Sequence, residues 1–127
     1  GRVARHGDDV LIVTWANGLH LSLRVARRLA VQGIGARVLD LRWLAPLPVE
    51  DILREANATG RVLVVDETRR TGGVSEGVMA ELVDAGFEGR VARVTSKDSF
   101  VPLGDAARLV LVSEGEIESA VVALLEA

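Results

Sequence analysis

Three carboxylates occupy positions where a parallel β-sheet could use them for chemistry. Asp66, Glu67 and Asp98 fall at the ends of predicted strands, where the loops of an open α/β sheet form its binding crevice. With His20 nearby, they could hold a metal ion or act as an acid and base pair. A receiver-type phosphoacceptor site would need acidic residues after the first strand, but the Asp8-Asp9 pair precedes it. We therefore interpret these groups as solvated loop carboxylates that cap helices.

Two glycine-containing segments have the composition of a loop that could bind phosphate. Thr71-Gly72-Gly73 precedes a predicted helix, so its backbone N–H groups could bind an anion, and Arg69 and Arg70 could add positive charge. The same glycines equally allow a close turn onto the sheet. Gly33-Ile34-Gly35 instead follows a helix and precedes a strand, which predicts a helix stop and a tight turn. The residues alone thus predict no catalytic, cofactor-binding or metal-ligating constellation.

Composition and charge restrict the class of protein. The chain has 127 residues, the length of one domain, and hydrophobic residues make up 49% of it, enough to bury a core. A net charge of −3 without a basic stripe argues against nucleic acid as a partner. The absence of cysteine agrees with a cytoplasmic location. Neither a membrane span nor a signal peptide is recognisable, and because the first residue is Gly rather than Met we expect a fragment of a longer chain.

Short β-rich runs alternate with helical patterns, which is typical of a parallel sheet covered by helices. Near-continuous apolar runs predict strands at Val10–Trp15, Val38–Leu41, Arg61–Asp66 and Arg90–Thr95. Leu109–Val112 could add a short final extended piece. Val3–Arg5 would form either a hairpin with the run that starts at Val10 or an antiparallel edge strand.

Apolar residues at helical spacing mark the buried faces of four predicted helices. The first helix begins after Asn17-Gly18 and ends at Gln32-Gly33. Pro48 suits the first turn of the second helix, and Ser113 with Glu116 predicts a reciprocal capping box at the start of the fourth. In chain order the predicted faces are Leu19, Leu23, Ala26 and Ala30; Val49, Ile52, Leu53 and Ala56; Val74, Val78, Leu82 and Ala85; Ile117, Ala120, Val121 and Leu124.

The order of motifs resembles a known domain over essentially the whole chain. The motifs are DVLIVTWANGLHLSLRVARRLAVQGIGARVLDLRWLAPLP, GRVLVVDETRRTGG and RVTSKDSFVPLG. They resemble the C-terminal domain of the beta subunit of thiamine-diphosphate-dependent 2-oxo-acid dehydrogenase decarboxylases, of the pyruvate and branched-chain type. The resemblance implies one transketolase C-terminal-like domain over residues 1–127. Its fold would be α/β, a three-layer α/β/α sandwich with a mostly parallel five-stranded mixed sheet and an antiparallel first strand.

The resemblance also implies what such a domain does. The parent enzyme oxidatively decarboxylates a 2-oxo acid and passes the acyl group to lipoyl-lysine, using thiamine diphosphate and Mg that other domains hold. This domain would bind neither, carry no catalytic residue and be inactive alone.

Assembly is the expected role of the domain. The implied partners are the alpha subunit or alpha region, a two-fold-related beta domain, and the acyltransferase, whose basic binding domain would meet acidic groups here. The candidate contact residues are Trp43, Arg69, Arg70, Glu114 and Glu118.

Several alternatives stay open. Transketolase, deoxyxylulose-phosphate synthase and the pyruvate–ferredoxin oxidoreductases contain a related domain. From the residues alone, a free-standing module that binds a phosphate or nucleotide through the segment from Arg69 to Gly73 is also open.

Overall fold

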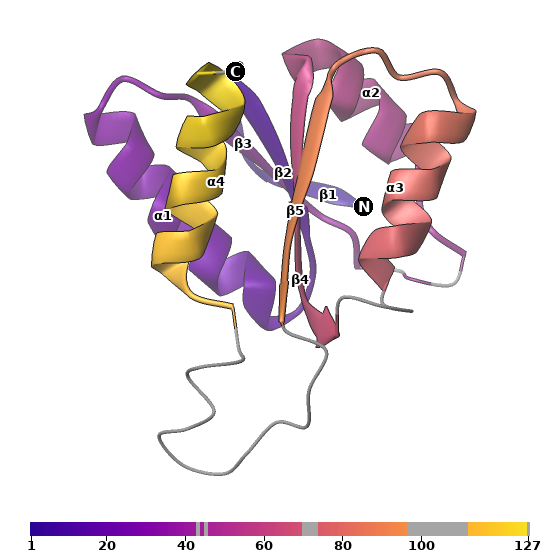
Figure 1. Ribbon diagram of the computed structural model, residues 1–127, viewed down its shortest axis with the longest axis horizontal. Coiled ribbons are helices and arrows are strands. Elements are labelled where there is room, and N and C mark those ends of the chain that lie inside the picture. Colours follow the sequence, from indigo (N-terminus) through magenta and orange to yellow (C-terminus); the bar gives the residue numbers. More distant parts are fainter. Residues whose placement is uncertain (43, 45, 70–73, 97–111, 127) are drawn as a thin grey trace, which may run out of the picture.

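A five-stranded sheet lies between two pairs of helices (Figure 1). The computed structural model describes residues 1–42, 44, 46–69, 74–96 and 112–126. Helices α1 and α4 cover one face of the sheet and α2 and α3 the other. The elements are β1 (Arg2–Arg5), β2 (Val10–Thr14), α1 (Asn17–Val31), β3 (Ala36–Asp40), α2 (Val49–Thr59), β4 (Arg61–Arg69), α3 (Val74–Asp84), β5 (Arg90–Ser96) and α4 (Glu114–Glu126).

The strand order is β1-β3-β2-β4-β5. Strand β1 runs antiparallel to β3, and the other three pairings are parallel. The predicted three-layer fold with an antiparallel first strand is therefore confirmed. Of the two alternatives for Val3–Arg5, the hairpin is wrong and the edge strand is correct, because β1 pairs with β3 rather than with β2.

The strand boundaries differ from the predicted ones at their ends. Strand β2 stops at Thr14, one residue before Trp15, while β4 and β5 continue to Arg69 and Ser96. Strand β3 starts at Ala36, two residues earlier than predicted. Val112 lies in no strand, and the rest of Leu109–Val112 falls outside the described residues.

The buried face of α1 is rotated from the predicted one. Ala30 is exposed, and Leu19 and Leu23 are only partly buried. The residues that face the sheet are Gly18, Ser22, Val25, Ala26 and Leu29. The face is rotated because α1 lies very close to β2, so close that a Cβ atom on Gly18 would overlap Thr14 Oγ1. Small residues at four-residue spacing bring α1 against the sheet, and a search for large apolar side chains misses them.

The other helices keep most of their predicted faces. Ile52 and Ala56 of α2, Val78 and Leu82 of α3, and Ile117, Val121 and Leu124 of α4 are buried. Val49 and Leu53 are partly buried, while Ala85 is exposed just beyond the end of α3. Pro48 occupies the position immediately before α2 rather than its first turn.

A buried ion pair fixes α2 against the sheet, and sequence reasoning missed it. Glu55 of α2 is buried, and its Oε1 accepts a hydrogen bond of 3.0 Å from Arg37 Nη1 of β3. Arg37 also donates to the Gly7 carbonyl at 2.8 Å and to Asp8 Oδ1 at 3.0 Å. Because one guanidinium satisfies all three acceptors, the carboxylate can be buried without a partnerless charge.

We expect Ser22→Ala to stabilise the domain. The Ser22 hydroxyl is fully buried in the α1 face and has no hydrogen-bond partner among the described residues, and a buried unsatisfied polar group costs about 1–3 kcal/mol. Urea unfolding should show a gain of about 1 kcal/mol over that of Ser119→Ala, a control at an exposed position in α4 that reports helix propensity alone. Equal gains from the two variants would contradict the prediction.

Candidate site at the carboxyl ends of the strands

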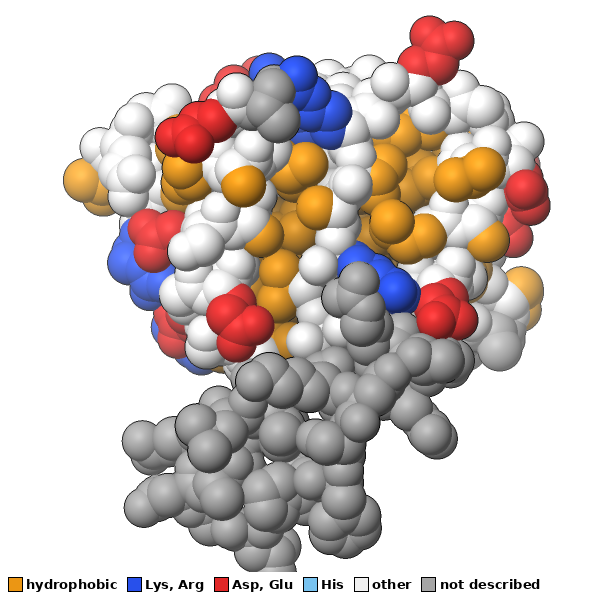
Figure 2. All heavy atoms as spheres, viewed as in Figure 1, with side chains coloured by type: hydrophobic (Ala, Val, Ile, Leu, Met, Phe, Trp, Pro, Cys, Tyr) orange, Lys and Arg blue, Asp and Glu red, His pale blue; other side chains and the backbone are white. Residues whose placement is uncertain are grey.

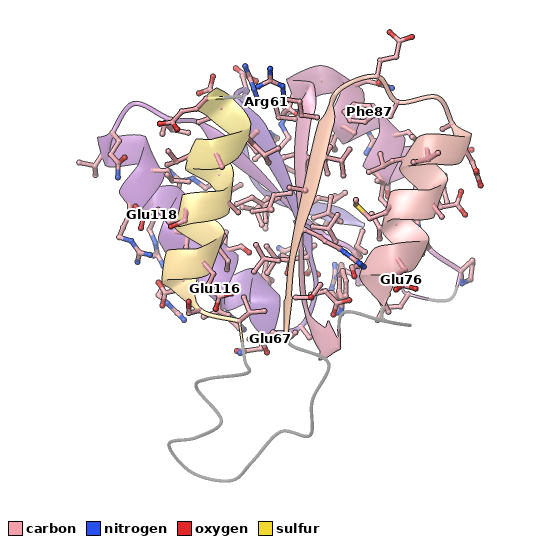
Figure 3. All side chains as sticks on the ribbon, in the orientation of Figure 1. Arg61, Glu67, Glu76, Phe87, Glu116 and Glu118 are labelled. Atoms are coloured by element: carbon pink, nitrogen blue, oxygen red, sulfur yellow. The ribbon has the colours of Figure 1, made fainter. Side chains whose placement is uncertain are left out.

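Strands β2 and β4 lie side by side, and the chain crosses to opposite sides of the sheet after β2 and before β4. At such a switch point, the crevice beyond the carboxyl ends of the strands is the usual ligand site of an open α/β sheet. Figure 3 shows Glu67, Glu76 and Glu116 gathered at this end of the sheet, with Arg61 and Phe87 at the other end. The carboxyl ends of the strands are therefore the candidate ligand site of this sheet.

The polar groups at the switch point hold the two strands and α1 together. Thr14 Oγ1 donates a hydrogen bond of 3.1 Å to the Val65 carbonyl oxygen. Asn17 Nδ2 lies 3.2 and 3.3 Å from the two carboxylate oxygens of Glu67. These bonds fix where β2 ends and where α1 begins.

Asp66 is buried and caps α3. Its Oδ2 accepts a hydrogen bond of 2.9 Å from the Ser75 backbone N–H in the first turn of the helix. Arg93 Nη1 of β5 donates to the Ser75 hydroxyl at 3.3 Å and lies 3.9 Å from Glu76 Oε1. The interpretation of Asp66 as a helix cap thus agrees with the structure, although the carboxylate is buried rather than solvated.

The backbone is strained where β2 passes into α1. Ala16, the residue before the helix, has φ 50° and ψ −130°. A residue with a Cβ rarely adopts this conformation, which glycine tolerates. The turn is sharp because Gly18 must approach Thr14 closely two residues later.

Those of the remaining predicted site residues that the structure describes form no group of metal ligands. His20 is exposed on α1, and no three His, Asp or Glu side chains among the described residues come together as metal ligands. Asp98, Thr71-Gly72-Gly73, Arg70 and Trp43 lie outside the described residues, and of Arg69 only the backbone is described. The Gly33-Ile34-Gly35 turn is as predicted, since Gly33 has φ 81° and the Ile34 N–H donates to the Leu29 carbonyl at 3.0 Å.

Glu114 and Glu118 are bound to α1. Glu114 accepts hydrogen bonds of 3.0 Å from Arg24 Nε and 2.8 Å from Arg28 Nη1. Glu118 Oε2 lies 3.5 Å from Arg28 Nε, and its Oε1 accepts a bond of 3.2 Å from Gln32. Each side chain is 29% exposed. Their predicted contact with a partner stays a prediction, and within the domain they join α4 to α1.

The start of α4 has the predicted cap with one difference. The Glu116 backbone N–H donates to Ser113 Oγ at 3.2 Å. The Glu116 carboxylate accepts from the Ser113 hydroxyl, also at 3.2 Å, where a full capping box would use the Ser113 backbone N–H. An open groove of about 630 Å³ lies beside this cap, between α4 and the end of β5. In the space-filling view, hydrophobic side chains flank the backbone of β5 on both sides (Figure 2).

Comparison with known proteins identifies the domain. The family model of the transketolase C-terminal domain matches residues 1–117. This chain belongs to the transketolase C-terminal domain family. Its similarity to beta subunits of the pyruvate dehydrogenase E1 component is 34% identity over 118 residues for the Bacillus subtilis protein and 31% for that of Staphylococcus aureus. Both matches cover 91% of this chain but 36% of the relative, so the domain spans about a third of their length.

Two solved structures share the fold of this domain. The inactive beta4 tetramer of a split-gene transketolase matches 98% of this chain and 41% of its own, with a TM-score of 0.87 and 28% identity. A 2-oxoglutarate:ferredoxin oxidoreductase from Magnetococcus marinus shares the fold, with a TM-score of 0.69 and 17% identity. The transketolase C-terminal fold is thus confirmed. Among the described residues, no helix is long and apolar enough to cross a membrane.

We expect Ala16→Gly to stabilise the domain because glycine relieves the strain at φ 50°. The gain in the free energy of unfolding should be about 1 kcal/mol, since strain at such a position costs roughly 1–3 kcal/mol and glycine adds chain entropy to the unfolded state. The same change at exposed Ala123, inside α4, should instead cost about 1 kcal/mol. Thermal unfolding measures both, and a loss at both positions would contradict the assigned strain.

The link between α1 and α4 should make stability depend on pH. Hydrogen bonds from Arg28 and then Arg24 hold the pKa of the Glu114 carboxyl below its ordinary value. A lowered folded-state pKa adds stability that is complete above the ordinary glutamate pKa of about 4.3 and is lost as pH falls through the lowered value. Unfolding curves of the parent and Glu114→Gln should therefore differ most above about pH 5 and converge in acid. A pH-independent difference would contradict this, and Glu88→Gln, at an exposed position, serves as control.

Proposed function

We propose that this chain is the C-terminal assembly domain of the beta subunit of a pyruvate dehydrogenase-type decarboxylase component. The parent would oxidatively decarboxylate a 2-oxo acid and transfer the acyl group to lipoyl-lysine in the cytoplasm. The single observation that carries the proposal is the match of 91% of this chain to about a third of pyruvate dehydrogenase beta subunits. The domain would contribute to assembly by contacting the alpha subunit, a two-fold-related beta domain and the acyltransferase.

The chemistry of the described residues supports an assembly role. The carboxylates at the switch point, Asp66 and Glu67, are each hydrogen-bonded to a helix start, at Ser75 N–H and Asn17. These side chains position helices, which is what a domain needs in order to present a rigid surface.

Thiamine diphosphate and Mg belong to the proposal through the parent enzyme only. Among the residues that the structure describes, no three His, Asp or Glu side chains come together as metal ligands. In the proposed parent, other domains supply the cofactor.

A split transketolase is the second candidate. The observation that favours it is the TM-score of 0.87 with 98% of this chain matched to a split-gene transketolase. In that case the parent would transfer a ketol unit, and the same domain would again act in assembly. The two candidates differ in the chemistry of the parent and not in the part that this domain plays.

A chimera tests the assembly role directly. This chain should replace the matching third of the Bacillus subtilis beta subunit, and the chimera should be coexpressed with a tagged alpha subunit. We expect the chimera to copurify with the alpha subunit and to decarboxylate pyruvate. The 127-residue chain alone should show no decarboxylation of any 2-oxo acid.

Control proteins show whether the assembly depends on this domain. A beta subunit truncated before the domain should lose copurification if the domain acts in assembly. A folded chimera that fails to bind the alpha subunit, or decarboxylation by the isolated chain, would contradict the proposal. A chimera with the split-gene transketolase beta chain, assayed for ketol transfer, decides between the two candidates.

A further inference from the structure

The arginines of α1 divide into paired and unpaired groups. Arg24 and Arg28 are neutralised by Glu114, and Arg28 also faces Glu118. Arg27, on the same helix, is exposed and pairs with no carboxylate of the described residues. Arg5 of β1 is likewise without an ion pair there. Arg5 and Arg27 therefore keep an unpaired positive charge among the described residues, as does the exposed Arg2 of β1.

These two arginines line one groove. A groove of about 140 Å³ is lined by Ala4 and Arg5 of β1 and by Leu23 and Arg27 of α1. Ala4 and Leu23 pack against the core that α1 covers, so they give the groove an apolar floor. Two guanidinium groups thus flank a shallow apolar strip, an arrangement that suits carboxylates on an otherwise apolar segment.

The strand that forms one wall is an edge of the sheet. Strand β1 pairs with β3, and no other described strand lies against it. The outer edge of such a strand presents N–H and C=O groups that can pair with an added strand. The other charged groups near β1 do not cancel Arg5 and Arg27. Asp40 faces Arg2 in the β1–β3 register, while Asp8 is bound to Arg37.

We propose that the groove between β1 and α1 binds an extended acidic segment of a protein partner, which adds along β1 and places its carboxylates on Arg5 and Arg27. Charge complementarity favours an acidic partner, because the two unpaired charged groups at the groove are both cations. The groove is thus locally positive although the net charge of the chain is −3. In an extended segment, alternate residues point to one side, so a segment with an acidic residue at every second position would turn its carboxylates toward the groove and the two arginines. This inference concerns the surface of the domain and does not depend on the identity of the parent enzyme.

Peptide titration followed by NMR tests the proposal. The probe is acetyl-EVEVEV-amide, and acetyl-KVKVKV-amide is its charge-reversed control. The acidic peptide should shift the amide signals of β1 saturably, and the shifts should weaken as salt rises from about 50 to 300 mM. The basic peptide should not shift them. Equal shifts with both peptides would overturn the proposal.

Matched variants separate the groove from the net charge. Arg5→Gln with Arg27→Gln should weaken binding of the acidic peptide at least about tenfold. Val83→Glu with Ala85→Glu changes the net charge by the same amount at exposed positions on and just after α3, in the other layer, and should leave binding unchanged. Equal weakening by the two double variants would overturn the proposal. If the first double variant unfolds, Arg27→Gln alone, at an exposed position, carries the test.

Competition with oligo(U) distinguishes binding of acidic side chains from binding of a phosphate backbone. Oligo(U) should not compete with the acidic peptide for the β1 amide signals. If oligo(U) shifts these signals and the acidic peptide does not, the groove is a phosphate-backbone site and the proposal fails. The outcome is independent of the chimera experiment, because neither peptide nor oligo(U) binding requires the alpha subunit.

Discussion

Strand β2 exposes none of its five side chains to solvent, and the arrangement of the domain follows from that burial. A strand buried on both faces needs a neighbour on each edge and helices on each face. β3 and β4 supply the edges, while α1 and α2 pack on opposite faces. The remaining elements extend this centre outward, with β1 and β5 as the two outer strands.

The same constraint determines what the polar residues at the carboxyl ends of the strands can do. Close packing of α1 on β2 requires a sharp turn, which the structure achieves with the strained Ala16 and the bare Gly18. Asn17 and Asp66 then secure the starts of α1 and α3 by hydrogen bonds, and Thr14 joins β2 to β4. In many α/β proteins, polar groups at this position face a ligand. Here these three side chains hydrogen-bond to neighbouring strands and helices of the domain. The domain is accordingly best understood by its outer surfaces.

The fold could be predicted from the sequence because buried strands and helix faces repeat at characteristic periods. The runs that begin at Val10 and Arg61 are read directly from apolarity. Three features could not be predicted in this way. The face of α1 depends on small residues. Glu55 pairs with Arg37, 18 residues away, as well as with the adjacent Arg54, and Glu114 pairs with arginines 86 and 90 residues away. Each depends on tertiary contacts that local spacing does not encode.

The contacts between α1 and α4 have a consequence for how the chain folds during synthesis. Helices α2 and α3 are complete by Asp84, so their face of β2, β3 and β4 can be covered early. The opposite face waits for Ile117, Val121 and Leu124 in the last helix. Contacts between the two ends of a chain form slowly because a long loop must close first. A nascent chain of this domain therefore emerges from the ribosome with one face of the sheet packed and the other covered by α1 alone, and the packing of α4 on that face comes late.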